Sequence, residues 1–199
     1  MKRMIIAAIL SLAAICSHAQ YNCQIAVFGS ITDGVTDNTA TIQKAVDMVS
    51  ANGGGTLSFA VGRYLTGAIE LKDNVTIELK EGAVLVASPN IHSFGGHKAL
   101  IWSDGAENVA VIGRGSIDGN GAALGAAVKD QYSKGYIESA GIPALVDLSG
   151  CTGARVEGIK LINPAGEGIL GVKPEGVYVY DYAAGKCITP SGKTIKIQK

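Results

Sequence analysis

The sequence is poor in aromatic residues and prolines, and its acidic side chains are not clustered. Only 6% of its 199 residues are aromatic, with a single tryptophan, and there are 5 prolines. No two acidic residues are adjacent or separated by one residue, so no local motif of paired carboxylates is present. The basic residues form no patch interleaved with aromatics, which argues against nucleic acid as a partner.

The 4 cysteines of the chain give no metal-binding spacing. If Cys16 is removed with a signal peptide, Cys23, Cys151 and Cys187 remain, so at least one thiol is free or pairs with another molecule. Cys151 reads as a small buried apolar residue. We expect no metal and no cofactor.

Two weaker chemical motifs leave that expectation unchanged. Gly113-x-Gly115 resembles part of a dinucleotide-binding loop, but Asp118 stands where the third glycine belongs. His92 and His97 flank a phenylalanine in one loop, which suggests either a metal pair or two solvated histidines. The second interpretation is preferred, because no third ligand lies at a useful spacing.

The first nineteen residues have the pattern of a signal peptide. Lys2 and Arg3 precede an apolar run from Met4 to Ile15, which is shorter than the roughly 20 residues of a spanning helix. Ser17-His18-Ala19 is a small-residue cleavage site, and we expect cleavage after Ala19 and a secreted or periplasmic protein. An uncleaved anchor is the alternative. Without Lys2 and Arg3, 15 basic and 17 acidic residues remain (17 − 2 against 17), a net charge of −2.

Residues 20–199 are expected to form one domain that begins with a loop and a helix. The loop spans Gly29 to Asn38, and Asp37, Asn38 and Thr39 are candidate N-caps. Apolar residues then recur at helical spacing between Thr39 and Ala51. Gly53-Gly54-Gly55 ends this helix. A single amphipathic helix ahead of many short strands is expected to cover the open end of a strand stack.

An internal repeat of three short strands follows the helix. Its units start near Ala68, Ala99 and Ala144, so 31 and then 45 residues separate them, which indicates loops inserted at Pro89–Lys98 and Gly119–Ile142. Successive units are expected to stack as parallel strands with inward apolar rows. The predicted rows are Ile69, Ile101 and Val146, and Val75, Val109 and Ala154. Asn74 and Asn108 are expected to form an amide ladder at one turn.

The opening residues resemble those of pectin-degrading β-helix proteins, and more closely the polygalacturonases of glycoside hydrolase family 28. The opening motif is carried by Phe28, Gly29, Asp33, Gly34, Asp37, Thr39, Gly53, Gly54 and Gly55. The resemblance continues through Tyr64–Gly67, Asn74–Thr76 and Gly113–Gly119, and it covers roughly residues 28–163. It implies an all-β fold, a right-handed parallel β-helix with an N-terminal capping helix.

The resemblance also implies a chemistry whose residues are missing. Family members are inverting hydrolases of polygalacturonic acid with Asn-Thr-Asp, Asp-Asp, Gly-His-Gly and Arg-x-Lys motifs, and none of these occurs here. Gly96-His97-Lys98 is the nearest match, but it lies in an early loop. We therefore assign no catalytic residue. We expect an N-terminal, truncated portion of such an enzyme that is inactive alone, with an acidic plant cell-wall polysaccharide as its partner. The alternatives are a non-catalytic polysaccharide-binding or structural module, and a site shared between subunits.

Several residues are considered as ligand contacts. Asp104, Glu107 and Asp118 either line a groove or are turn acids, and Trp102 and Tyr132 either stack on a sugar ring or pack in core and loops. Residues 164–199 depart from the family pattern and contain two alternating segments, Glu175–Tyr180 and Thr194–Ile197. The preferred interpretation is a last pair of strands that closes the solenoid. The alternative is a resemblance to C-terminal secretion-sorting tails of Gram-negative surface proteins.

Overall fold

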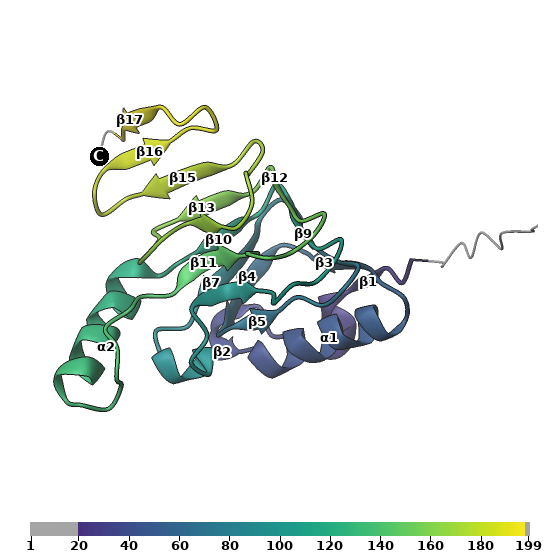
Figure 1. The fold of residues 1–199 in the computed structure, drawn as a ribbon, viewed down its shortest axis with the longest axis horizontal. Coiled ribbons are helices and arrows are strands. Elements are labelled where there is room, and N and C mark those ends of the chain that lie inside the picture. The colour runs from purple at the N-terminus through teal and green to yellow at the C-terminus, as the bar shows by residue number, and fades with distance from the viewer. Residues whose placement is uncertain (1–19, 198–199) are drawn as a thin grey trace, which may run out of the picture.

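A computed structural model describes residues 20–197 and shows a chain wound into successive coils (Figure 1). The expected signal peptide, residues 1–19, lies outside the described residues. Each full coil gives one strand to each of three sheets. Sheet A contains β1 (Cys23–Gln24), β3 (Gly55–Phe59), β6 (Val75–Leu79), β9 (Ala110–Gly113) and β12 (Arg155–Glu157), in that spatial order.

The other two sheets complete the coil. Sheet C contains β5 (Ile69–Glu70), β8 (Ala99–Trp102), β11 (Ala144–Asp147) and β14 (Ile169–Leu170). Sheet B contains β2 (Asp33–Asp37), β4 (Gly62–Thr66), β7 (Ala83–Ala87), β10 (Ser116–Asp118), β13 (Lys160–Ile162), β15 (Tyr178–Asp181), β16 (Lys186–Ile188) and β17 (Thr194–Lys196). All pairings are parallel except those of β16 with β15 and β17. The architecture is a parallel β-helix.

Apolar side chains stack from coil to coil in the interior. Ile101 pairs in register with Ile69 and with Val146, and all three are buried. Both predicted rows are confirmed, because Thr76 and Arg155 each pair with Ala110, which aligns Val75, Val109 and Ala154. At about 25 cal/mol per Å² of apolar area removed from water, such rows are the main favourable contribution to folding.

The helix α1 (Thr39–Ala51) has the bounds that the sequence predicted. Its buried stripe, Ile42, Ala45, Val46 and Val49, packs on β3 and β5 at the front of the coil. Oδ1 of Asp37 accepts the N–H of Thr39 at 2.8 Å. Asn38 occupies the N-cap position without capping the helix. It is buried, and its Oδ1 accepts the N–H of Ile31 at 2.8 Å, which fixes the preceding loop.

The glycines after α1 let backbones approach closely. Gly55 has φ 152°, and a Cβ there would lie 2.3 Å from the carbonyl oxygen of Tyr21. A Cβ on Gly54, at φ 93°, would lie 2.3 Å from Cβ of Asn74. Only glycine fits such positions, so this part of the opening motif is explained by packing.

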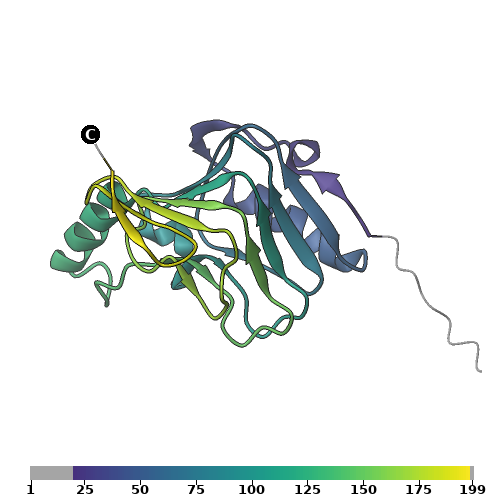
Figure 2. The same cartoon turned by 90° about the horizontal axis from the view of Figure 1, so that it is seen from above.

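Within the described residues, three further helices lie in the loops between strands. Two are short 3₁₀ segments, Ile25–Phe28 and Ile91–Phe94. The insertion after β10, which the repeat spacing marked as a loop, contains the helix α2 (Gly121–Ser133). It buries Leu124 and Val128 and projects from one side of the coil (Figure 2). None of the helices within residues 20–197 has the length and apolar character needed to cross a bilayer.

The C-terminal segment differs from the expected closing pair. Besides β14, which belongs to sheet C, it forms β15, β16 and β17, and these three lengthen sheet B beyond the last strands of sheets A and C (Figure 1). β15 continues the parallel ladder by pairing with β13, and β16 and β17 add antiparallel hairpins. The segment therefore extends one wall of the coil.

Candidate functional site

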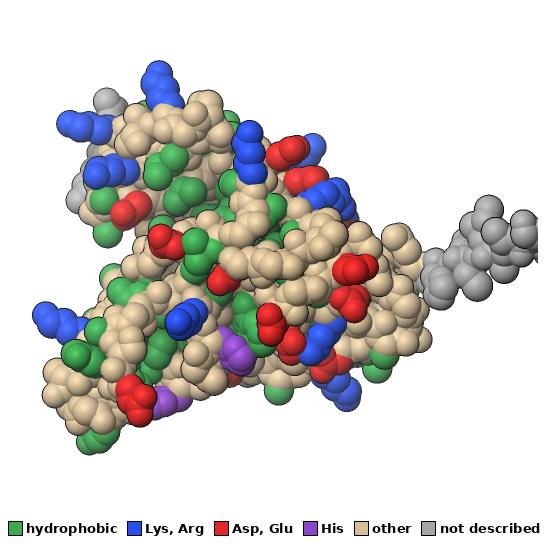
Figure 3. Space-filling view, in the orientation of Figure 1, with side chains coloured by type: hydrophobic (Ala, Val, Ile, Leu, Met, Phe, Trp, Pro, Cys, Tyr) green, Lys and Arg blue, Asp and Glu red, His purple; other side chains and the backbone are tan. Residues whose placement is uncertain are grey.

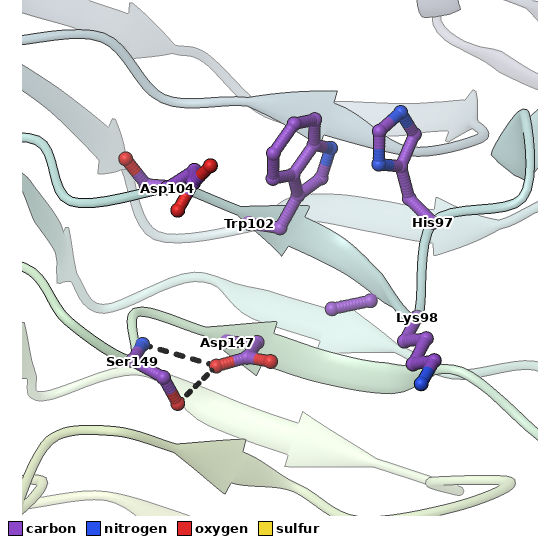
Figure 4. A pocket seen from close by; sticks show the side chains of 8 residues that line it. His97, Lys98, Trp102, Asp104, Asp147 and Ser149 are labelled. Atoms are coloured by element: carbon purple, nitrogen blue, oxygen red, sulfur yellow. Dashed lines mark hydrogen bonds between the residues drawn. The ribbon is translucent and has the colours of Figure 1, made fainter.

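A groove of about 270 Å³ lies on the outer face of sheet C. It is built from the loop before β8, from β8 and β11, and from the turns that follow these strands (Figure 4). Its lining residues are His97, Lys98, Ala99, Trp102, Ser103, Asp104, Asp147 and Ser149. Two neighbouring coils thus supply the whole groove.

Strand register explains why these side chains face outward. Trp102 pairs with Glu70 on one side and with Asp147 on the other. Their neighbours Ile101 and Val146 are buried in the core, and successive side chains of a strand point to opposite faces. Trp102 therefore lies outside the core, and its ring packs on His97 of the loop before β8, so of the core and loop packing considered from the sequence only the loop packing is found.

The imidazole of His97 stacks on the indole of Trp102, with ring centroids 4.0 Å apart and an interplanar angle of 18°. Lys98 follows His97 directly and lies at the same end of the groove (Figure 4). Aromatic faces of this kind are suited to the C–H face of a sugar ring, and an ammonium group is suited to a carboxylate.

Two carboxylates line the same groove from adjacent coils. Oδ1 of Asp147 accepts two hydrogen bonds from Ser149, one from its N–H at 3.0 Å and one from its hydroxyl at 2.6 Å. Asp104 is exposed beyond Trp102. The sequence placed Asp104 in a possible groove with Glu107 and Asp118. The structure keeps only Asp104 there and brings in Asp147.

The remaining candidates lie elsewhere. Glu107 forms a β-bridge to Thr152, and Asp118 lines a different cavity behind sheet B. Tyr132 is 50% exposed on α2 and does not line the groove. The face seen in Figure 3 mixes acidic and basic side chains, with histidine also exposed on it, so neither sign dominates it.

The structure separates the two loop histidines by role. The backbone N–H of His92 donates to Oδ1 of Asn90 in a turn, whereas His97 stacks in the groove. Within residues 20–197, no three His, Cys, Asp or Glu side chains are placed to hold a metal ion. Burial raises the pKa of the Cys23 thiol, so this cysteine is poorly suited to act as a nucleophile.

Comparison with solved structures gives the family. A candidate glycosyl hydrolase from Parabacteroides merdae is 44% identical, with a TM-score of 0.72, over 81% of this chain and 73% of that one. An exo-poly-α-D-galacturonosidase of Dickeya chrysanthemi is 28% identical over 77% of this chain. The chain belongs to the polygalacturonase-like β-helix proteins. No protein-family model matches it.

The fold of this polygalacturonase-like chain is the right-handed parallel β-helix. The family 28 exopolygalacturonase of Yersinia enterocolitica superposes with a TM-score of 0.68 at 24% identity, over 80% of this chain and 39% of that enzyme. The chain spans about a third of the Dickeya enzyme, 34% of its length. The resemblance drawn from the opening motif is thus confirmed for family and fold.

Sequence reasoning did not find Lys98 or Ser149 as groove residues. Lys98 directly precedes the strand at Ala99–Trp102, and Ser149 lies two residues after the strand at Ala144–Asp147, both of which the repeat had identified. Their positions at the strand ends were the available signal. That signal does not contain the register between coils, which decides which strand ends lie side by side.

Proposed function

We propose that this protein binds an acidic, galacturonan-like polysaccharide in the sheet C groove and does not hydrolyse it alone. The observation that carries the proposal is the stacked pair of His97 and Trp102 beside Lys98. A uronate ring would lay its apolar face on the aromatic pair and its carboxylate against the lysine. The names of the similar Dickeya and Yersinia enzymes support a galacturonan as the ligand.

The proposed lack of hydrolysis rests on the residues of the groove. An inverting glycosidase needs an acid and a base about 6.5–9.5 Å apart, with room for a water between them. The family's acidic motifs do not occur in this sequence. Oδ1 of Asp147 accepts hydrogen bonds from both the N–H and the hydroxyl of Ser149 in a turn, which favours a structural role for this carboxylate.

A second candidate function, hydrolysis in the same groove, is favoured by one observation. Asp104 and Asp147 line one cavity together with Lys98, which is the mixture of carboxylates and a cation that uronate hydrolysis requires. This candidate predicts release of reducing ends from polygalacturonate, and loss of that activity in Asp104→Asn and in Asp147→Asn.

We also propose that the protein is exported to the periplasm or beyond the cell. The signal-peptide pattern of residues 1–19 supports this, as does the galacturonan named for its Dickeya relative, a polymer too large to enter a cell. Amino-terminal sequencing of the protein from periplasmic and medium fractions tests it, and a mature end at Gln20 is expected. Full-length protein in the cytoplasm alone would contradict the proposal.

One experiment separates the two activities. Purified protein is incubated with polygalacturonate, reducing ends are measured over a day, and affinity electrophoresis in a polygalacturonate gel measures binding. The proposal expects retarded migration without reducing-end release. Lys98→Gln should lose the retardation, whereas Lys129→Gln, which removes the same charge from exposed α2, should keep it. Migration unchanged by the polysaccharide would overturn the binding role.

A further inference from the structure

A second and larger cavity, of about 610 Å³, lies on another flank of the coil. It is formed where β10, β13 and β15 end and α2 begins, so sheet B and not sheet C supplies its walls. Asp118, Asn120, Asn163, Asp181 and Tyr182 bring the polar and aromatic groups into it. None of these residues lines the sheet C groove.

An aromatic stack ends at this cavity. Tyr178 and Tyr180 stack with centroids 6.2 Å apart and planes inclined by 20°, and Tyr180 and Tyr182 follow at 6.0 Å and 14°. One face of the Tyr182 ring is turned to Tyr180, and no aromatic ring within residues 20–197 stacks on its other face. The side chain lines the cavity and the residue is 51% exposed. A flat ring is therefore available at the cavity wall.

The polar groups around this ring are only partly used by the protein. Asn163 Oδ1 accepts the N–H of Tyr182 at 3.1 Å, and Asp181 Oδ1 accepts the N–H of Ala184 at 2.8 Å. Asn120 Nδ2 donates to the carbonyl of Ala87 at 3.2 Å. Among the described residues, Nδ2 of Asn163, Oδ2 of Asp181 and Oδ1 of Asn120 have no partner. One donor and two acceptors match hydroxyl groups, which both donate and accept.

Charge decides which kind of ring fits. Oδ2 of Asp118 pairs with Arg63 at 3.3 Å. Asp181 has no basic partner within 4.0 Å among residues 20–197. The cavity lining holds two carboxylates and no lysine, arginine or histidine, and Lys186, the in-register partner of Asp181 on β16, makes no ion pair with it. A uronate carboxylate is therefore disfavoured there by charge.

We propose that this cavity binds a neutral sugar ring of a polysaccharide, stacked on the open face of Tyr182 and hydrogen-bonded to Asn120, Asn163 and Asp181. Stacking on an aromatic ring and hydrogen bonds to amide and carboxylate groups are complementary to the two sides of a sugar. The site goes beyond the proposed uronate binding and does not depend on it, because its residues, flank and charge differ.

The test uses neutral oligosaccharides with the full-length mature protein. Tetrasaccharides of galactan, arabinan, xylan and glucan are titrated by calorimetry, and saturation-transfer NMR identifies the bound rings. At least one neutral tetrasaccharide is expected to bind, about tenfold more weakly to Tyr182→Ala, which corresponds to about 1.4 kcal/mol. Tyr136→Ala, which removes a 68% exposed tyrosine from outside both cavities, should bind as the wild type does.

Two further variants keep the outcome decisive. Tyr182→Leu retains apolar volume without a ring and should lose the same tenfold if stacking is responsible. Asp181→Asn should keep neutral binding and newly admit galacturonate. The proposal is overturned if no neutral tetrasaccharide binds at 10 mM, or if Trp102→Ala abolishes the binding and Tyr182→Ala does not. Failure here leaves uronate binding in the sheet C groove untouched, because Trp102 reports on that groove separately.

Discussion

Asn108 donates from Nδ2 to Oδ1 of Asn74 across 3.0 Å, which joins the same turn of two successive coils. Both residues have positive φ, 54° and 60°, a conformation that asparagine tolerates better than other side chains. The bond confirms the amide ladder expected from the sequence. It also marks the coil repeat, because the strands that follow both residues pair in register.

Replacing Asn108 tests this ladder. Asn108→Ala loses the hydrogen bond and places alanine at positive φ, so the free energy of unfolding should fall by about 1–2 kcal/mol. Asn108→Gly loses the bond but accepts the backbone angle, and its loss should be smaller. Urea denaturation followed by circular dichroism measures both. Equal losses in the two variants would show that the backbone angle contributes nothing.

The packing of α1 makes a second prediction. Ile42 is fully buried against the front of the coil, so Ile42→Ala should lower the free energy of unfolding by about 2–4 kcal/mol through lost burial and a cavity. Lys44→Ala lies on the exposed side of the same helix and should change it by less than about 0.5 kcal/mol. Similar urea midpoints for the two variants would contradict the role of α1 as the cover of the coil.

Gly67 and Gly125 should respond oppositely to alanine. A Cβ on Gly67 would lie 1.9 Å from the carbonyl oxygen of Ser93, so Gly67→Ala forces two backbone segments apart. A Cβ on Gly125, inside α2, meets nothing closer than 4.0 Å. Gly125→Ala should therefore stabilise the protein by about 0.5–1 kcal/mol through helix propensity, whereas Gly67→Ala should lower its melting temperature. An unchanged melting temperature in Gly67→Ala would mean that the loop around Ser93 can move away from the added Cβ at no cost in stability.

The burial of Tyr64 leads to a prediction of how the free energy of unfolding changes with pH in the alkaline range. Burial raises the pKa of this phenol, and its hydrogen bond to the carbonyl of Ala60 opposes the shift in part. A pKa raised in the folded state means that the stabilisation is complete below pH 10, the ordinary pKa, and is lost as the pH rises through the folded value. Urea denaturation between pH 8 and 11 should show a steeper decline for the wild type than for Tyr64→Phe. If stability declined equally with pH in the wild type and in Tyr64→Phe, the ionisation of Tyr64 would not be the cause of the decline.

Much of the fold follows from local sequence patterns. The bounds of α1 were predictable because the apolar spacing and the glycines after Ala51 are local signals. The rows through Ile101 and Val109 were predictable because each repeat unit contains the same three short apolar segments, although the spacing between units varies. The sequence did not predict that β15 pairs with β13 and leaves the coil open. This pairing depends on which strand edge is free once the coils have formed.

The groove was less accessible from the sequence than the fold. β8 reads Ala-Leu-Ile-Trp, four apolar residues in a row, so its sequence has no polar and apolar alternation that would tell which side chains face outward. Its contact with His97 joins a loop to a strand, and Asp147 arrives from the next coil, after a 45-residue spacing between repeat units. Such contacts need the register between coils, which no local pattern contains.

The single tryptophan of the protein lies in the groove, so its fluorescence gives the most direct test of the central claim. The mature protein is titrated with an oligogalacturonate of about ten units while Trp102 emission is recorded, and the same samples are assayed for new reducing ends. Binding without cleavage predicts a saturable change in emission, weakened about tenfold in Lys98→Gln, which corresponds to about 1.4 kcal/mol, and no new reducing ends. Unchanged emission at saturating oligogalacturonate, or reducing ends that accumulate with enzyme concentration, would contradict it.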